Sequence, residues 1–278
     1  MNVITLPTDL NLDQAQSIQI FDYCSVQEID RQQIVLNQHT FSFLLEGRKE
    51  VVFDRATQTI DPSHFLLMKA GHCLMTEKLS EGESYRSVLL FFSTEAIQKF
   101  IQNIAIDFDQ SIENQSVHAF RYDDFILRFV KSLLDVNQLS KEIQPRLLAV
   151  KFEEIMWYLV EKYGRGVLYS LLSTHDNSAQ KFIRTIESNM HCKLTIKELA
   201  FLCNMSVSTF KRTFEKHYAE SPMKWFQNKR LEYGHYLLHI EKKTATEIYS
   251  EIGYESLSSF IQAYKAKYGQ TPKQHHKI

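Results

Sequence analysis

The order of apolar and polar residues changes character twice along the chain. Between residues 20 and 93, short apolar runs of strand length are separated by turn signals about every ten residues. The runs 39–45 and 49–53 flank Gly47 and predict a hairpin. The run 85–92 is rich in Val, Leu and Phe. We therefore expect a small β-barrel or sandwich in this region.

From residue 94 to residue 172 the apolar positions follow the period of a helix instead. Ala96, Ile97 and Phe100 fit one helical face, and the stretch 147–163 fits another. We expect this region to be helical and to pack against the strands.

The polar segment 173–178 has no period and marks a domain boundary. It divides the chain into a first domain at 1–172, with a barrel at about 20–93 and helices at about 94–172, and a second domain at 179–278. Because the second domain shows only helical patterns, the chain as a whole is predicted to be an α+β protein.

The second domain contains an internal repeat. A ladder of three aromatic residues at four-residue spacing, followed by a proline, occurs twice. The two copies are Phe210, Phe214, Tyr218 and Pro222, and then Phe260, Tyr264, Tyr268 and Pro272. The spacing predicts that the aromatic side chains lie on the inward face of a helix and form a core.

Each ladder is preceded by a capping box, the signature of a helix N-terminus. The boxes begin at Thr195 and Thr244. A capped short helix, a tight turn and a second helix form a helix-turn-helix unit, so we expect one unit at about 195–218 and another at about 244–268. Pro222 opens a central helix that joins the two units.

The charge of the chain is unevenly distributed. The net charge is -1, but residues 179–278 contain 16 Lys and Arg against 9 Glu and no Asp, a balance of +7. The remaining residues carry -8. This asymmetry indicates that the second domain meets phosphate and that the acidic first domain does not bind DNA.

Several other classes of protein are not indicated. The four cysteines form no C-x-x-C pair, which argues against a zinc finger or a disulfide framework. No apolar run approaches the roughly 20 residues of a membrane span, and the N-terminus lacks the layout of a signal peptide. We expect a cytoplasmic protein with no cofactor and no contact with a membrane.

The second domain resembles the AraC/XylS family of bacterial transcription regulators over about residues 180–275. The residues that carry the resemblance are Leu199-Ala200, Ser206 to Phe214, Lys229 to Leu231, Leu237-Leu238, Glu247-Ile248, Gly253-Tyr254, Phe260, Tyr264, Tyr268-Gly269 and Thr271-Pro272. The resemblance implies a promoter-binding regulator, most often an activator that recruits RNA polymerase. It also implies an N-terminal cupin-like barrel with helices that senses a signal and forms a homodimer.

Carried over by position, the resemblance places the base-facing side chains on the second helix of each unit. We therefore expect DNA-binding residues at Ser206, Ser208, Lys211, Arg212, Lys216, Ser256, Leu257, Ser258, Gln262 and Lys265. The first helix-turn-helix unit offers more hydrogen-bond donors, so we expect it to contribute more to the recognition of the DNA sequence. The family usually has a small residue where Tyr249 stands, so this tyrosine must tilt a helix or find an outlet.

The first domain offers candidates for sensing and for self-association. An apolar pocket would be lined by Phe41, Phe43, Met68, Leu90 and Phe92. A dimer contact would use Phe125, Phe129 and Leu133. The signal is either a small molecule in the barrel or a regulatory protein bound to this domain.

Two alternatives from other classes remain. The first is a cupin-type metal enzyme with an accessory DNA-binding tail. Metal-dependent cupins use an H-x-H pair, whereas the strand region, which contains His64 and His72, has no such pair, so neither catalytic nor metal-binding residues are predicted. The second is an architectural DNA-binding protein without a sensing function.

Overall fold

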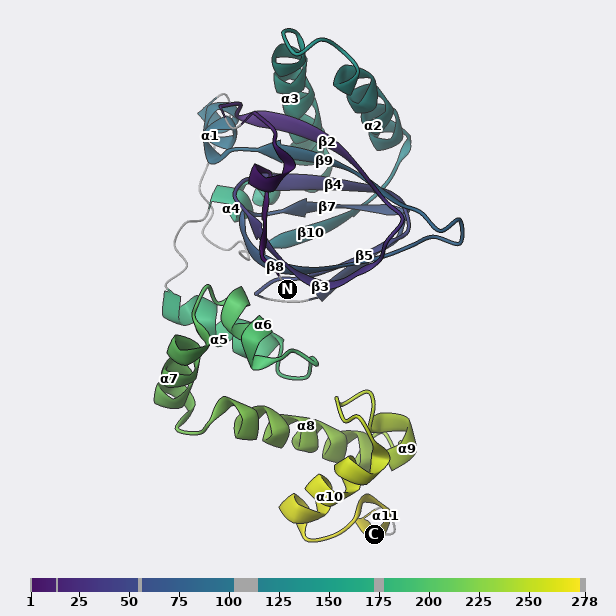
Figure 1. The fold of residues 1–278 in the computed structure, drawn as a ribbon, viewed down its shortest axis with the longest axis vertical. Helices are drawn as coiled ribbons and strands as arrows, with labels where there is room; N and C mark the ends of the chain where they lie inside the picture. Colours follow the sequence, from purple (N-terminus) through teal and green to yellow (C-terminus); the bar gives the residue numbers. More distant parts are fainter. Residues whose placement is uncertain (1, 14, 55–56, 103–114, 173–177, 276–278) are drawn as a thin grey trace. The chain divides into compact units, whose positions relative to one another are not determined.

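The computed structural model describes residues 2–13, 15–54, 57–102, 115–172 and 178–275. It separates into two compact units, Met1–Gln180 and Lys181–Ile278. Each unit is described below by itself (Figure 1). Residues 173–177 of the expected boundary lie outside the described part of the chain.

The first unit contains two five-stranded sheets. The outer sheet has the order β1 (Ile4–Leu6), β3 (Ile29–Leu36), β8 (Gly71–Lys78), β5 (Arg48–Val52) and β6 (Thr57–Ile60). The central sheet has the order β10 (Val117–Arg121), β7 (His64–Met68), β4 (His39–Glu46), β9 (Tyr85–Phe92) and β2 (Ile18–Ser25). A 3-10 turn, η1 (Thr8–Leu10), follows β1.

Of the expected barrel or sandwich, the structure has two separate sheets and no closed barrel among the described strands. The reason lies in the central sheet, which is buried on both faces. In β4, Phe41 and Phe43 join a core shared with helices, whereas Leu44 joins a second core shared with the outer sheet. Because successive side chains of a strand point to opposite faces, one apolar run supplies both cores.

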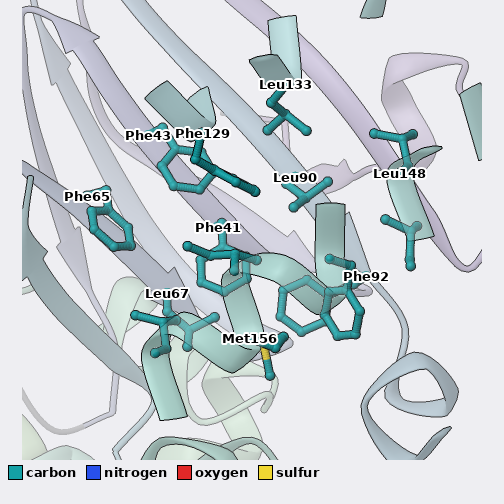
Figure 2. Close-up of a cluster of buried hydrophobic side chains, with 14 of the residues drawn as sticks. Phe41, Phe43, Phe65, Leu67, Leu90, Phe92, Phe129, Leu133, Leu148 and Met156 are labelled. Carbon is teal, nitrogen blue, oxygen red and sulfur yellow. The ribbon is translucent and has the colours of Figure 1, made fainter. Parts of the chain in front are cut away.

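The core on the helix side is rich in aromatic rings. Phe43 lies 5.2 Å from Phe65 and 5.8 Å from Phe129 between ring centroids. Figure 2 shows these rings together with Phe92 and Met156 in one continuous cluster. The helices that close this core are α1 (Thr94–Gln102), α2 (Asp124–Asn137), α3 (Gln144–Tyr163) and α4 (Gly166–Leu172).

The region after residue 94 is not wholly helical, contrary to expectation. β10 adds an edge strand to the central sheet, antiparallel to β7, with Val117 opposite Met68 and Phe120 opposite Phe65. A strand of five residues gives too short a pattern to be distinguished from a loop by period alone. The strand extends the sheet that α2 and α3 cover.

The second unit is all-α, and its expected architecture is confirmed. Its helices are α5 (Ser178–Ser188), α6 (Ile196–Leu202), α7 (Val207–Tyr218), α8 (Pro222–His239), α9 (Ala245–Ile248), α10 (Leu257–Tyr268) and α11 (Pro272–His275). The pairs α6–α7 and α9–α10 form two helix-turn-helix units, and α8 joins them (Figure 1). No helix within the described ranges is long and apolar enough to cross a membrane.

A buried histidine fixes the start of β4. His39 is 3% exposed, and its Nδ1 accepts a hydrogen bond from the backbone N–H of Ala70 at 3.3 Å. Its Nε2 lies 3.3 Å from the hydroxyl of Thr94. Burial and the charge of Lys69 lower the pKa of His39 to about 4, so the folded protein holds this ring neutral.

We predict that the first unit loses stability as the pH falls from about 6.5 to about 4. Over this range the unfolded state takes up a proton that the folded His39 does not bind, which costs up to about 1.4 kcal/mol per pH unit. Urea unfolding at several pH values, followed by Trp157 fluorescence in a Trp225→Phe background, measures this slope.

The matched variant is His39→Gln, which retains hydrogen-bonding groups but does not titrate. Its slope should be shallower than that of the parent protein, with a remainder from His118, whose pKa burial also lowers. Equal slopes in the two proteins would contradict the role of His39.

Candidate nucleic-acid interface and sensing cavity

The first helix-turn-helix unit is built by local capping. Thr195 and Glu198 exchange two hydrogen bonds, with the Thr195 N–H donating to Glu198 Oε2 at 2.6 Å and the Glu198 N–H donating to Thr195 Oγ1 at 3.2 Å. Asn204 takes the left-handed conformation in the turn, with φ 54°. The Ser206 hydroxyl then accepts from the Thr209 N–H at 3.1 Å and starts α7.

Helix α7 has an apolar inner face and a polar outer face. Phe210 and Phe214 are fully buried and contact the ring of Phe182. The expected DNA-binding side chains Ser208, Lys211, Arg212 and Lys216 are all exposed. Ser206 is also exposed, but its hydroxyl is already engaged as the helix cap.

The second helix-turn-helix unit has a shorter first helix and a less polar recognition helix than the first. Its capping box is present, with the Thr244 N–H donating to Glu247 Oε2 at 2.7 Å. The sequence pattern predicts a first helix over residues 246–252 in this unit, whereas helix α9 ends at Ile248. Tyr249 stands at its C-cap, half-buried against the core of this unit, so the regular helix stops before the tyrosine.

Helix α10 presents fewer charged groups than α7. Ser258, Gln262 and Lys265 are exposed. Leu257 is half-buried and packs against the core, which leaves it less free for DNA contact. The hydroxyl of Ser256 caps the helix and accepts from the Ser259 N–H at 3.2 Å.

Helix α8 holds the two helix-turn-helix units together. At its first end Trp225 packs on Phe214, with ring centroids 5.6 Å apart. Further along, Gly234 lies close to the second helix-turn-helix unit. A Cβ at this position would stand 2.9 Å from Ile252 Cδ1 and 3.4 Å from Phe260 Cε2. The glycine therefore permits the close approach of α8 to this unit.

Polar contacts reinforce this junction. Arg230 Nη1 donates to the Gly253 carbonyl oxygen at 3.5 Å, and its guanidinium lies 5.9 Å from the centroid of the Tyr254 ring. Lys267 Nζ of α10 donates to the Asn228 carbonyl oxygen at 2.9 Å and to Glu232 at 3.0 Å. Arg230 therefore bridges α8 to the turn of the second unit.

A cavity of about 130 Å³ lies between the two sheets of the first unit. Most of its lining is apolar. The lining residues are Ile4, Leu6, Leu10, Phe21, Tyr23, Ile29, Ile34, Leu36, Thr40, Lys49, Met68, Met75, Glu77 and Leu89. They come from both sheets and from η1.

Only Met68 of the five expected pocket residues lines this cavity. Phe41, Phe43, Leu90 and Phe92 lie on the other face of the central sheet, where they fill the core against the helices (Figure 2). The correction follows from the alternation of side chains along a strand, because the sequence does not show which face a cavity occupies.

A buried ion pair lies at the edge of the cavity. Lys49 Nζ is 3.2 Å from Glu77 Oε1, and the two side chains are 2% and 5% exposed. Lys49 also donates to the Ser42 hydroxyl at 3.2 Å. Burial alone would lower the pKa of Lys49, but Tyr85 and Glu77 raise it above its ordinary value, so the ammonium stays charged.

The side chains expected at a dimer contact are not free to make one. Phe129 and Leu133 are buried in the core between α2 and the central sheet. Phe125 stacks on Tyr158 of α3 at 4.1 Å. Phe129 and Leu133 therefore pack inside the unit, whereas Phe125 is half-buried.

Two features of the candidate sites were missed in the sequence. Val207 is exposed at the first position of α7, beside the cap, where helix-turn-helix proteins contact base edges. Its place directly after Ser206 was the available signal. The pairing of Lys49 with Glu77 carried no such signal, because it depends on the register of β5 against β8.

Comparisons with known proteins match two separate parts of the chain to two family models. Residues 39–171 match the family model of the ExsA N-terminal regulatory domain, and residues 199–277 match that of a helix-turn-helix domain. The HTH-type transcriptional regulator ExsA of Pseudomonas aeruginosa is 26% identical over 238 residues, which cover 82% of each chain. The XylDLEGF operon transcriptional activator of Pseudomonas putida is 27% identical over 234 residues, or 75% of this chain and 73% of that protein.

A solved structure of apo ToxT from Vibrio cholerae aligns with a TM-score of 0.44 and 12% identity, covering 95% of this chain and 98% of that one. The helix-turn-helix pair, the regulatory-domain match and the relatives define a DNA-binding transcription activator with an N-terminal regulatory domain. The chain belongs to the AraC family of transcription regulators. These relatives are regulators, so the alternative of a cupin-type metal enzyme is not favoured.

We predict that Gly234→Val destabilises the second helix-turn-helix unit by about 1–3 kcal/mol, the usual cost of overpacking a filled core. The new side chain would meet Ile252 and Phe260. Native-state hydrogen exchange of the α10 amides measures the effect locally.

The matched control is Met223→Val, on an exposed position of the same helix. It adds a valine to α8 without the clash and costs roughly a few tenths of a kcal/mol in helix propensity, whereas replacing a glycine by valine gains helix propensity. If both variants increased the hydrogen exchange of the α10 amides equally, the close approach of α8 at Gly234 would not limit the stability of this unit.

Proposed function

We propose that the chain reads double-stranded promoter DNA through two adjacent major-groove segments, with the first helix-turn-helix unit supplying most of the base reading. The observation that carries this is the exposed polar face of α7, where Ser208, Lys211 and Arg212 stand together. Arginine and lysine donate to the O6 and N7 acceptors of guanine in the major groove. On α10, Gln262 suits adenine, and Ser258 adds a weaker donor.

The length of α8 supports the use of both units on one face of the duplex. It spans 18 residues, or about 27 Å at 1.5 Å per residue. One turn of B-DNA is about 34 Å. A rod of this length fits two recognition helices entering neighbouring stretches of the major groove.

Phosphate contacts supply much of the affinity in this proposal. Lys216 and Lys265 are exposed in the last turns of α7 and α10. The Ser206 and Ser256 caps place backbone N–H groups and hydroxyls at the two helix starts, where phosphates are commonly bound. The balance of +7 in residues 179–278 supports such contacts.

In the same proposal, the N-terminal unit, residues 1–180, receives a signal in the cytoplasm and thereby controls transcription activation. Activation proceeds by recruiting RNA polymerase. The cavity between the sheets supports a small-molecule effector. A regulatory protein bound to the first unit is the second candidate, supported by the exposed apolar side chains of α2 and α3.

Helix α3 is the proposed dimer surface. Val150 and Trp157 are 62% and 45% exposed and stand seven residues apart, on one face of the helix. This face is distinct from the one that carries Phe152 and Met156 into the core. Large exposed apolar side chains at such spacing suit a helix-to-helix contact between two copies.

We predict that Arg212→Ala weakens operator binding by about 1–3 kcal/mol and relaxes the base preference at one position. Selection of bound sites from random DNA, followed by affinity measurement, tests both effects. Lys216→Ala should instead leave the preference intact and reduce the slope of log K against log salt by about one.

Gln262→Ala in the second unit is the comparator. It should cost less than Arg212→Ala, because α10 presents fewer charged donors. An equal or larger loss at Gln262 would remove the proposed inequality of the units, and an unchanged base preference in Arg212→Ala would remove its reading role.

A separate prediction concerns self-association. Val150→Glu should shift the chain toward monomer in sedimentation measurements, because a carboxylate would have to be buried between helices. Leu127→Glu places the same change on an exposed position of α2 and should have little effect. A parent chain that is monomeric at high concentration would contradict the proposal.

A further inference from the structure

The cavity between the sheets has one polar corner in an otherwise apolar lining. Glu77 lines the cavity, and its Oε1 pairs with Lys49. Its second oxygen, Oε2, is buried and has no hydrogen-bond partner among the described protein atoms. A buried acceptor left without a donor costs about 1–3 kcal/mol, so this oxygen favours a partner that brings one.

The donors near this corner are already in use. Lys49 donates to Glu77 Oε1 and to the Ser42 hydroxyl, and its ammonium lies 5.8 Å from the centroid of the Tyr85 ring. The Thr40 hydroxyl donates to the Gln38 carbonyl oxygen at 3.2 Å. Tyr23 also lines the cavity, and its hydroxyl is hydrogen-bonded to the Glu77 carboxylate. Burial and this carboxylate raise the pKa of the Tyr23 hydroxyl.

The charge of the corner restricts the ligand further. The carboxylate of Glu77 balances the ammonium of Lys49, so the pair is neutral as a unit. An anionic ligand at Oε2 would meet a second carboxylate, and a cationic ligand would add a positive charge that the pair does not balance. Both would be buried in a medium of low dielectric, where an unbalanced charge is costly.

We propose that this cavity binds an uncharged, mainly apolar molecule whose hydroxyl group donates a hydrogen bond to Glu77 Oε2. The inference rests on the proposed regulatory role of the first unit and names the chemical class of its effector. The cavity volume of about 130 Å³ sets the scale. An engineered apolar cavity of about 150 Å³ binds benzene, so a six-carbon alcohol is a fitting probe.

The test uses the full chain with ¹³C-labelled methionine methyl groups. Met68 and Met75 line the cavity, while Met223 is exposed in the second unit and serves as an internal control. Hexan-1-ol should shift the Met68 and Met75 signals saturably and leave Met223 unchanged. Hexanoate and hexylammonium should bind at least about tenfold more weakly, because each would bury a charge that the Lys49–Glu77 pair does not balance.

A double variant tests the acceptor itself. Glu77→Gln alone would leave Lys49 unpaired in the interior and could unfold the unit, whereas Lys49→Met with Glu77→Leu removes both charges together. The double variant should bind hexan-1-ol about tenfold more weakly and should no longer prefer it over 1-methoxypentane, which lacks a donor. Parent-like binding of the alcohol by the double variant would overturn the proposal.

Two further outcomes would also overturn it: hexanoate binding as tightly as hexan-1-ol, or hexan-1-ol leaving Met68 and Met75 unshifted. Promoter binding by the parent chain without any probe is measured separately. Its loss would count against the proposed function, whereas intact promoter binding with no response to the alcohol would count only against the ligand class.

Discussion

The central sheet is buried on both faces, and this constraint decides where every other part of the first unit stands. Its strands carry apolar side chains on both sides, so one face requires a cover of helices and the other a second sheet. The helices α1 to α4 are therefore part of the core rather than additions to it.

The two faces of the central sheet are filled in different ways. The helix side is a dense set of aromatic rings, in which Phe43, Phe65 and Phe129 lie within 6 Å of a neighbour. The opposite side contains smaller side chains, the Lys49–Glu77 pair and the cavity. A pair of buried charges is weak evidence for stability, because an apolar replacement often folds as well. Its position at the cavity is consistent with the proposed recognition of a ligand.

Local signals in the sequence sufficed to predict most helices of the C-terminal unit, residues 181–278. The capping boxes at Thr195 and Thr244, the left-handed residue Asn204 and the aromatic ladders each act within a few residues, so they could be read directly. The early end of α9 could not be read, because it depends on how Tyr249 packs against the rest of the unit. In the first unit the strands were visible, but the division into two sheets, the added strand β10 and the face that bears the cavity are set by pairing over long sequence separations.

The two helix-turn-helix units differ in how they are held, and this bears on how DNA is read. The second helix-turn-helix unit meets α8 through Gly234, which permits close packing, and through the polar contacts of Arg230 and Lys267. A recognition helix held in this way keeps its distance from α7, because α8 is a continuous helix of 18 residues. The distance between two half-sites can then be recognised even where individual base contacts on α10 are few. In the proposed mode of binding, specificity depends on the donors of α7 and on the rigidity of the junction at Gly234, so a substitution at the junction would change the preferred site without touching a base.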